Sequence, residues 1–345
     1  MVNSKVSFGE FCDVWLGHYA KVSGVKGSTV DSRRKAIKRL KKYFDAIQIN
    51  NITTFMYQEA LINMKEQEEN ADNTIISTHS VAQMIFRRAI ELEVIKTDPT
   101  EFASVPKEVL TVDDLENKVE LPGYLEKEEL ALFLNTALKH GLDGDYETFL
   151  TLAYTGMRIG EFIPLRESDI DFAENIISIT KTYYSPNNNM LKYELHTPKT
   201  KTSVRVIDVD PMITTVLKSY IHKNKEFMML HRDRYYSKGY IMANKHKHPG
   251  YPMTLLHYQT RMKRLLKIAG LNENLTPHSL RHTHTSLLAE AGANLHDIMD
   301  RLGHVDDSTT KSVYLHVTRT VKKDTSKKFG DLLKTVENQN FVIKM

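Results

Sequence analysis

The sequence predicts a mainly α-helical protein of the α+β class, in which a small antiparallel sheet of three strands is confined to the second of two domains. Apolar residues recur with helical periodicity through the first 110 residues, where no segment reads as a convincing strand. Alternating β-branched segments cluster instead between residues 176 and 209. A proline-containing stretch of mixed charge near residues 104–121 separates the two patterns. We therefore expect a helical domain at 1–110, a linker at 111–122, a mostly helical second domain at 123–325 and a tail at 326–345.

Four helices are predicted in the first domain. The clearest begins near Ser28, a good N-cap residue with Asp31 three positions later. Its apolar stripe consists of Val30, Ile37, Leu40 and Phe44. The other three helices are expected at residues 7–21, 53–68 and 74–93.

The opposite face of the Ser28 helix is strongly basic, and the helix at 74–93 ends in a second basic pair, Arg87 and Arg88. Seven cations fall within ten residues, namely Arg33, Arg34, Lys35, Lys38, Arg39, Lys41 and Lys42. Such a density suits a helix that lies along or in a DNA groove. A merely solvated face is the alternative.

Composition gives bounds on the class of protein. With 345 residues, 41% hydrophobic and 26% charged, the chain is long enough for two domains with cores of their own. It has no run of eighteen apolar residues and no signal peptide, so we expect a cytoplasmic protein without a membrane segment. The single cysteine, Cys12, excludes an internal disulfide and a cysteine-based zinc site.

Charge is distributed unevenly along the chain, although the formal net charge is only +4. Residues 111–180 hold 5 Lys/Arg against 15 Asp/Glu, a net of −10, whereas residues 181–267 hold 17 against 5, a net of +12. This swing predicts a basic surface that binds phosphates, with a solvated lysine-rich surface as the alternative. Arg261 and Arg264, on a helix expected at 254–268, are candidate phosphate contacts.

The second domain is expected to begin with a helix from Tyr124 and a mostly apolar helix at 146–154 that ends at Gly156, a natural left-handed cap. Strands are predicted at 176–182, 190–197 and 204–209, followed by a helix at 211–231. Thr276 and Pro277 form a strong helix start. The helix that they begin ends near Gly292, and Asn294 caps another helix, which Gly303 terminates.

Four short clusters carry the chemistry. They are Arg158 in Tyr-Thr-Gly-Met-Arg-Ile-Gly-Glu, His278 and Arg281 in His-Ser-Leu-Arg-His, His304 in Leu-Gly-His, and Tyr314 ten residues later. Two arginines can neutralise the non-bridging oxygens of one phosphodiester, imidazoles can take up a proton, and a phenol can act as a covalent nucleophile. Glu161 lies one helical turn after Arg158 and can orient its guanidinium, although a surface salt bridge is the bland alternative.

Together the clusters resemble the tyrosine recombinase family, specifically the integrases of phages and bacterial mobile elements, over nearly the whole chain. The resemblance implies a helical core-binding domain, a catalytic domain that needs no metal or other cofactor, and a 3′-phosphotyrosyl intermediate formed by Tyr314. It further implies that Arg158 and Arg281 hold the phosphorane charge, that His278 acts as the base, and that His304 binds a phosphate oxygen. The turn Thr-Pro-Lys-Thr-Lys-Thr-Ser-Val-Arg resembles the one that carries the catalytic lysine of the family; spacing favours Lys201, and Lys199 stays open.

The resemblance also implies partners: double-stranded DNA attachment sites, a homotetramer on DNA, and a host DNA-bending protein or an excision factor. The tail at 326–345 is expected to dock on a neighbouring protomer, with packing in cis as the alternative. His246 and His248, like His278, His282 and His284, lack the accompanying acidic or thiol ligands of a metal site.

Two other functions use part of the same residue set. A type IB topoisomerase would share the chemistry but relax single duplexes, and relaxation by a monomer without joined products would favour it. A DNA-binding regulator with a degenerate catalytic core would keep the basic surface and lose some of the clusters, but every expected role has a candidate here.

Overall fold

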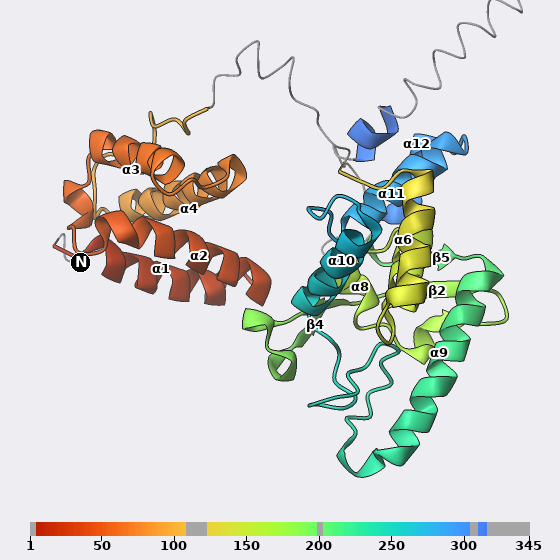
Figure 1. Ribbon diagram of the computed structural model, residues 1–345. Helices are drawn as coiled ribbons and strands as arrows, with labels where there is room; N and C mark the ends of the chain where they lie inside the picture. The colour runs from red at the N-terminus through yellow and green to blue at the C-terminus, as the bar shows by residue number, and fades with distance from the viewer. Residues whose placement is uncertain (1–4, 108–122, 199–202, 304–309, 316–345) are drawn as a thin grey trace, which may run out of the picture. The chain divides into compact units, whose positions relative to one another are not determined.

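The computed structural model describes residues 5–107, 123–198, 203–303 and 310–315. It divides into two compact units, Met1–Val119 and Glu120–Met345, which we call the N-terminal and the C-terminal unit (Figure 1). The predicted linker at 111–122 and tail at 326–345, and the candidate residues Lys199, Lys201 and His304, lie outside the described residues. None of the described helices is both long enough and apolar enough to cross a membrane.

The described part of the N-terminal unit is built from helices, as predicted. They are α1 (Phe8–Val22), α2 (Gly27–Phe44), α3 (Thr54–Glu66) and α4 (Asp72–Glu91), with a 3-10 turn at Ile49–Asn51. Helix α2 packs against both α1 and α4. Aromatic rings fill the core between them: the Phe8 ring lies 5.7 Å from that of Phe44 and 5.6 Å from that of Phe86, measured between centroids. Burial of these large side chains stabilises the unit.

The predicted start of α2 is wrong by one residue. The helix begins at Gly27 with Lys26 as its N-cap residue, so Ser28 lies inside the first turn. Gly24, two residues after the end of α1, adopts the left-handed conformation (φ 56°) that glycine permits. The apolar stripe is otherwise confirmed: Ile37, Leu40 and Phe44 are buried, and Val30 is half-buried.

The C-terminal unit is also mostly helical. It contains α6 (Lys127–His140), α7 (Asp145–Thr155), α8 (Ile159–Phe162), α9 (Pro211–Leu230), α10 (Leu255–Ala269), α11 (Ser279–Glu290) and α12 (Leu295–Leu302), followed by a helical turn at 310–315. Helix α7 packs against α6, α9 and α11, and α10 packs against α6 (Figure 1). Phe133, Phe149, Phe162 and Met262 are fully buried between these helices. Short 3-10 turns lie at Glu167–Asp169, Pro186–Asn188, Met190–Lys192 and Arg232–Arg234.

A three-stranded antiparallel sheet is present, as expected, and two of its strands lie within predicted segments, whereas β1 was not predicted. The order is β1 (Ile170–Asp171), β2 (Ile176–Ile179) and β5 (Arg205–Asp208), with Ile177 facing both Ile170 and Ile207. The segment predicted at 176–182 splits, and its second part, β3 (Thr182–Tyr184), pairs with β4 (Glu194–His196) in a separate two-stranded sheet. The Tyr183 and Tyr193 rings stack at 5.6 Å and hold this pair together.

Gly156, Gly303 and Asn294 mark helix ends in the C-terminal unit, as the local sequence signals predict. Gly156 (φ 63°) ends α7 and Gly303 (φ 69°) ends α12, both left-handed, and the Asn294 side chain accepts from the Asp297 amide. The start of α11 differs, because Thr276 and Pro277 form a turn and the helix begins at Ser279. His278 is therefore the N-cap residue of α11.

Candidate active site

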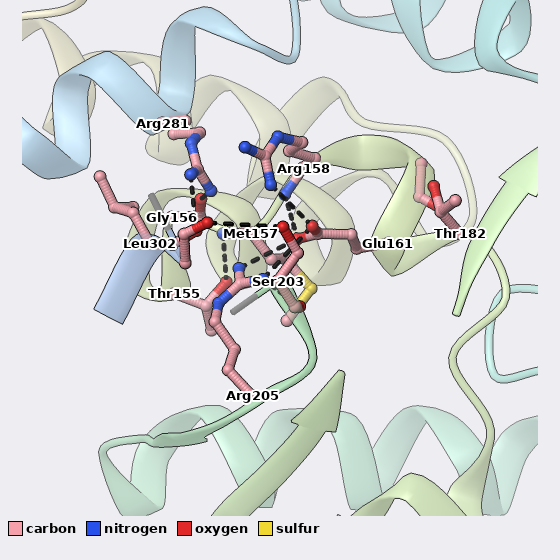
Figure 2. A network of polar contacts seen from close by, with 12 residues as sticks. Thr155, Gly156, Met157, Arg158, Glu161, Thr182, Ser203, Arg205, Arg281 and Leu302 are labelled. Carbon is pink, nitrogen blue, oxygen red and sulfur yellow. Dashed lines mark hydrogen bonds and ion pairs between the residues drawn. The ribbon is translucent and has the colours of Figure 1, made fainter. Parts of the chain in front are cut away.

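Arg158 and Glu161 form the first part of the site, at the junction between α7 and α8. Arg158 is the N-cap residue of α8, and its amide donates to Glu161 Oε2 at 3.0 Å. Its Nη1 donates to Glu161 Oε1 at 2.9 Å. The Arg158 side chain is 35% exposed and that of Glu161 only 3%, so the carboxylate holds the guanidinium from the protein side. The predicted contact between these two side chains is present (Figure 2).

A second arginine, Arg205 at the start of β5, binds the same carboxylate. Its Nη2 donates to Glu161 Oε2 at 3.0 Å and its Nη1 to Oε1 at 3.3 Å, while its Nε donates to the Arg301 carbonyl at 2.8 Å. The sequence alone did not indicate this contact. The two residues are 44 positions apart, and no local pattern joins them.

Glu161 is ionised in this environment. Burial by itself raises the pKa of a carboxyl group, but the hydrogen bonds and charges of Arg205 and Arg158 outweigh it and lower the pKa of Glu161 below its usual value. The site therefore contains a fixed negative charge between two guanidinium groups. Such a charge fixes the direction in which each guanidinium presents its remaining donors.

Arg281, on α11, joins three parts of the unit. Its buried guanidinium donates from Nη1 to the Gly156 carbonyl and from Nη2 to the Leu302 carbonyl, both at 2.7 Å. Gly156 lies two residues before Arg158, and Leu302 lies two residues before His304. Figure 2 shows the Arg281 and Arg158 side chains with the bonds that anchor them. The buried Arg281 guanidinium thus connects the segment that precedes Arg158 with the end of α12.

Gly156 has to be glycine for this packing. A Cβ atom there would lie 2.5 Å from His284 Cδ2 and 2.7 Å from Leu302 Cδ2, and its φ of 63° disfavours other residues. Helices α7, α11 and α12 therefore approach one another around this residue.

The histidines of α11 have separate environments. His278 is exposed, and its ring lies edge-on to the half-buried His282 ring at 5.0 Å between centroids. His284 is buried: Nδ1 donates to the Ala153 carbonyl at 2.9 Å and Nε2 accepts from Arg301 Nε at 3.2 Å. Burial, followed by the charge of Arg301, lowers the pKa of His284 to about 4, so its ring is neutral and supports the fold. Within the described residues, no three His, Cys, Asp or Glu side chains gather as a metal ion would require.

Tyr314 lies on the helical turn at 310–315. Its half-buried ring packs against the apolar cluster that Ala289 of α11 forms with Ile298 and Leu302 of α12. The candidate nucleophile therefore rests on the same two helices that Arg281 connects. Ser203 follows the segment that holds Lys199 and Lys201, and its Oγ donates to the Gly303 carbonyl at 3.5 Å. Ser203, which follows the segment of Lys199 and Lys201, therefore lies next to Gly303, which precedes His304.

Comparison with known proteins decides the family. The Phage integrase family model matches residues 123–320, and the model of the phage integrase N-terminal SAM-like domain matches residues 7–65. The chain belongs to the phage integrase family. Its C-terminal unit holds a tyrosine recombinase catalytic domain, which confirms the resemblance inferred from the motifs.

Relatives of this integrase match along most of its length. It is 29% identical over 343 residues to the integrase of Staphylococcus phage L54a, which covers 95% of this chain and 94% of the relative. It is 30% identical to the prophage ps2 probable integrase of Lactococcus lactis, over 93% and 82% of the two chains. The fold is similar to that of the Tn1549 transposon integrase in complex with transposon right end DNA, with a TM-score of 0.69, 22% identity, and coverage of 92% and 99%. A lambda integrase tetramer bound to a Holliday junction matches with a TM-score of 0.63, 16% identity, and coverage of 90% and 77%.

The candidate DNA-binding cations of the N-terminal unit fall into two groups. Arg34 pairs with Asp31, Lys41 with Asp13 at 2.9 Å, Lys42 with Glu68 at 2.8 Å, and Arg88 with Glu91 at 2.8 Å. Among residues 5–107, no carboxylate pairs with Arg33, Lys38 or Arg87, of which the last two are exposed. The unpaired cations are the ones that the fold leaves available for phosphates.

Arg261 and Arg264 of α10 have a role within the fold of the integrase that the sequence did not indicate. Arg261 Nη1 lies 3.1 Å from Oδ1 of the buried Asp145, and Arg264 Nη2 lies 3.5 Å from its Oδ2 and 2.8 Å from the His140 carbonyl. Arg261 is 15% exposed and Arg264 is 38% exposed. Arg261 therefore neutralises a buried carboxylate, whereas Arg264 keeps an open side, and a phosphate contact of either residue stays a prediction.

Proposed function

We propose that this integrase is a site-specific recombinase that cuts and rejoins DNA through a 3′-phosphotyrosyl intermediate, and so integrates or excises a phage or mobile element. The observation that carries the proposal is the pair of bonds from Arg281 to the carbonyls of Gly156 and Leu302. They hold the Arg158 segment beside the end of α12, on which the Tyr314 ring also packs. Two guanidinium groups and a phenol are thereby anchored on one set of helices.

The two arginines would stabilise the transition state. Attack on a phosphodiester produces a pentacovalent phosphorane whose equatorial oxygens carry the negative charge. Arg158 and Arg281 are cations that the protein holds in place before the reaction, so little reorganisation is needed as this charge develops. Glu161 fixes the orientation of Arg158 through the two bonds described above.

Proton transfers complete the step. The Tyr314 oxygen forms a bond to phosphorus as the bond from phosphorus to the 5′ oxygen breaks. A phenol has a pKa near 10 in water and needs a base during the attack, a role that we assign to His278. Lys201, with Lys199 as the alternative, would give a proton to the leaving 5′ oxygen, which thereby becomes a hydroxyl, and His304 would donate a hydrogen bond to a phosphate oxygen. One ester replaces another, so the step is nearly isoenergetic and the 5′ hydroxyl of a second DNA can reverse it.

Partners follow from the same assignment. The solved relatives include an integrase on transposon end DNA and a tetramer on a Holliday junction. We propose double-stranded attachment sites as the substrate and a homotetramer as the active assembly, with residues 326–345 docking on a neighbouring protomer. A host DNA-bending protein or an excision factor would assist, and the reaction would take place in the cytoplasm, where the DNA is.

A library of nicked half-site oligonucleotides tests the chemistry and the target sequence together. Cleavage close to the nick releases a short fragment and leaves the protein covalently attached, and sequencing of the trapped DNA identifies the site. We expect a covalent complex with the wild-type protein and none with Tyr314→Phe. Covalent trapping by Tyr314→Phe would overturn the assignment of the nucleophile, and plasmid relaxation without joined products would point to a topoisomerase.

A further inference from the structure

The guanidinium of Arg205 makes four hydrogen bonds inside the protein. Its side chain is 6% exposed and donates to the Glu161 carboxylate twice, to the Arg301 carbonyl and, from Nη1, to the Ser203 carbonyl at 3.2 Å. A guanidinium has five N–H donors in a fixed fork, and four bonds of this geometry hold it firmly. Because four of its five donors are already used within the protein, we expect Arg205 to affect the reaction through its partners.

The first partner, Glu161, also holds Arg158. The carboxylate is nearly inaccessible to water and is shared between two guanidinium groups. If Arg205 were removed, Glu161 would have only Arg158 to compensate its charge. A buried carboxylate with one cation draws that cation closer and becomes easier to protonate, and either change would misdirect Arg158.

The second partner is the end of α12. The last carbonyls of a helix have no partner within the helix and need another donor. Arg205 binds the carbonyl of Arg301, Arg281 that of Leu302, and Ser203 that of Gly303. Three consecutive carbonyls are thus bound by Arg281 of α11, by Arg205 of β5 and by Ser203, two residues before β5. These bonds fix the point from which the chain continues to His304 and to the helical turn of Tyr314.

From these two sets of contacts we infer that Arg205 is a positioning residue of the recombination site, which holds Glu161 so that Arg158 faces the scissile phosphate and which fixes the C-terminal end of α12. This inference rests on the proposed function. A positioning role differs from a role in folding alone. It requires that removal of Arg205 slows cleavage by displacing Arg158, the residue that we propose to bind the phosphate.

The test uses the full-length protein and a nicked half-site that the wild type cleaves. Arg205→Met removes the guanidinium with its charge and its hydrogen-bond donors, and Arg205→Lys keeps the positive charge but not the planar arrangement of donors. Lys181→Met is the matched control, because Lys181 forms a similarly shielded pair with Asp169, at 2.6 Å, in the same unit but outside the network. We expect single-turnover cleavage at saturating protein to fall about 100-fold in Arg205→Met, the cost of a misplaced reacting group, with unchanged DNA affinity. Arg205→Lys should recover part of the rate, and Lys181→Met should stay within about threefold of wild type.

Two further readouts separate positioning from folding. In Arg205→Met, burial of Glu161 is opposed only by Arg158, so the cleavage rate should fall more steeply as the pH decreases than it does in wild type and Lys181→Met, which share every other titrating group of the site. A methylphosphonate at the scissile position carries no negative charge and needs less help from Arg158. The rate loss of Arg205→Met should therefore shrink on this substrate.

The outcomes distinguish the inference from the proposed function. If Arg205→Met loses as much rate on the methylphosphonate as on the phosphodiester and has the same pH dependence as wild type, Arg205 is structural, although Tyr314→Phe remains inactive. If wild type forms no covalent complex or Tyr314→Phe still does, the proposed function itself fails. Should Arg205→Met not fold, the pH profile and methylphosphonate rate of Arg205→Lys decide, because the lysine keeps the charge but not the fork.

Discussion

Helix α2 and the arginine network of the C-terminal unit, formed by Arg158, Glu161 and Arg205, both contain pairs of a cation and a carboxylate. The pairs of the two regions differ in their exposure to water. On α2, Lys42 meets Glu68 with side chains 54% and 24% exposed. In the network, Arg205 meets Glu161 at a similar distance, 3.0 Å, but both side chains are almost completely buried. Distance alone does not separate the two pairs; access to water does.

The difference determines what each region can do. An exposed pair contributes about 0–1 kcal/mol to stability, because water screens it and two long side chains have to be ordered. Its carboxylate can be exchanged for a DNA phosphate at little cost. Breaking a buried pair leaves an uncompensated charge, at about 3–5 kcal/mol. The network is therefore suited to holding a geometry, and the helix to exchanging partners.

Among the variants considered, Glu161→Gln should cause the largest loss of stability. The amide keeps the shape of the side chain but leaves Arg158 and Arg205 without a counter-charge, so we expect the free energy of unfolding of the C-terminal unit to fall by about 3–5 kcal/mol. Urea denaturation measures it. Glu68→Gln is the matched control on the exposed side and should cost less than about 1 kcal/mol. Similar losses of unfolding free energy in Glu161→Gln and Glu68→Gln would contradict the difference that we draw between buried and exposed ion pairs.

Arg261 and Arg264 sharpen the comparison within one helix, because both face Asp145 but differ in exposure. We expect Arg261→Met to lower the free energy of unfolding by about 3 kcal/mol, since it leaves Asp145 largely uncompensated. Arg264→Met should cost about 1 kcal/mol, because its pair is longer and more exposed. Thermal and urea unfolding measure the losses. Because Asp145 already neutralises Arg261, DNA affinity should be unchanged in Arg261→Met; a weaker salt dependence of DNA binding in this variant would instead support Arg261 as a phosphate contact.

Protonation of the buried His284 should lower the free energy of unfolding of the C-terminal unit at acidic pH. Its pKa is lowered to about 4 in the folded protein and lies near 6.5 in an unfolded chain, so its contribution is complete above pH 6.5 and is lost as the pH falls toward 4. Between pH 7 and pH 4.5 we expect this residue to remove about 2 kcal/mol from the free energy of unfolding. His284→Asn should show a correspondingly shallower pH dependence in urea titrations. Equal slopes for the two proteins would rule out a neutral, buried ring.

Local signals in the sequence predicted the parts of the site that are local in space. Gly156 and Gly303 as helix ends, Asn294 as a cap, and the three-residue spacing of Arg158 and Glu161 each depend on the chemistry of a few neighbouring residues. These features are therefore readable from one segment. The two main departures at this level, the starts of α2 and α11, are shifts of a helix end by one or two residues.

Contacts between distant segments could not be predicted in this way. Arg205 lies 44 residues from Glu161, and Arg261 lies 116 residues from Asp145. Charge density alone assigned Arg261 to DNA, because composition records the cation and not the buried carboxylate that it meets. The pairing of β3 with β4 was missed for the same reason: strand propensity shows which residues are extended, and tertiary packing decides which strands pair.

The smallest expected effect tests whether α2 exchanges its partners. Lys38→Gln and Lys42→Gln should each change the free energy of unfolding by less than about 1 kcal/mol, since both side chains are exposed. In DNA binding, each phosphate contact contributes about 0.9 to the slope of log affinity against log salt. Lys38 has no carboxylate partner among residues 5–107, so its loss should lower the slope by nearly that amount.

Lys42 has to leave Glu68 before it can bind a phosphate, and this competition reduces its net contribution to affinity. We therefore expect Lys42→Gln to weaken DNA binding less than Lys38→Gln, in fluorescence anisotropy titrations over a series of salt concentrations. The double variant Lys42→Gln with Glu68→Gln should bind DNA more tightly than Lys42→Gln alone, because it also removes a carboxylate that repels the phosphates. If Lys42→Gln weakens binding more than Lys38→Gln, the paired cations are the DNA contacts and their carboxylates hold them in position, as Glu161 holds Arg158.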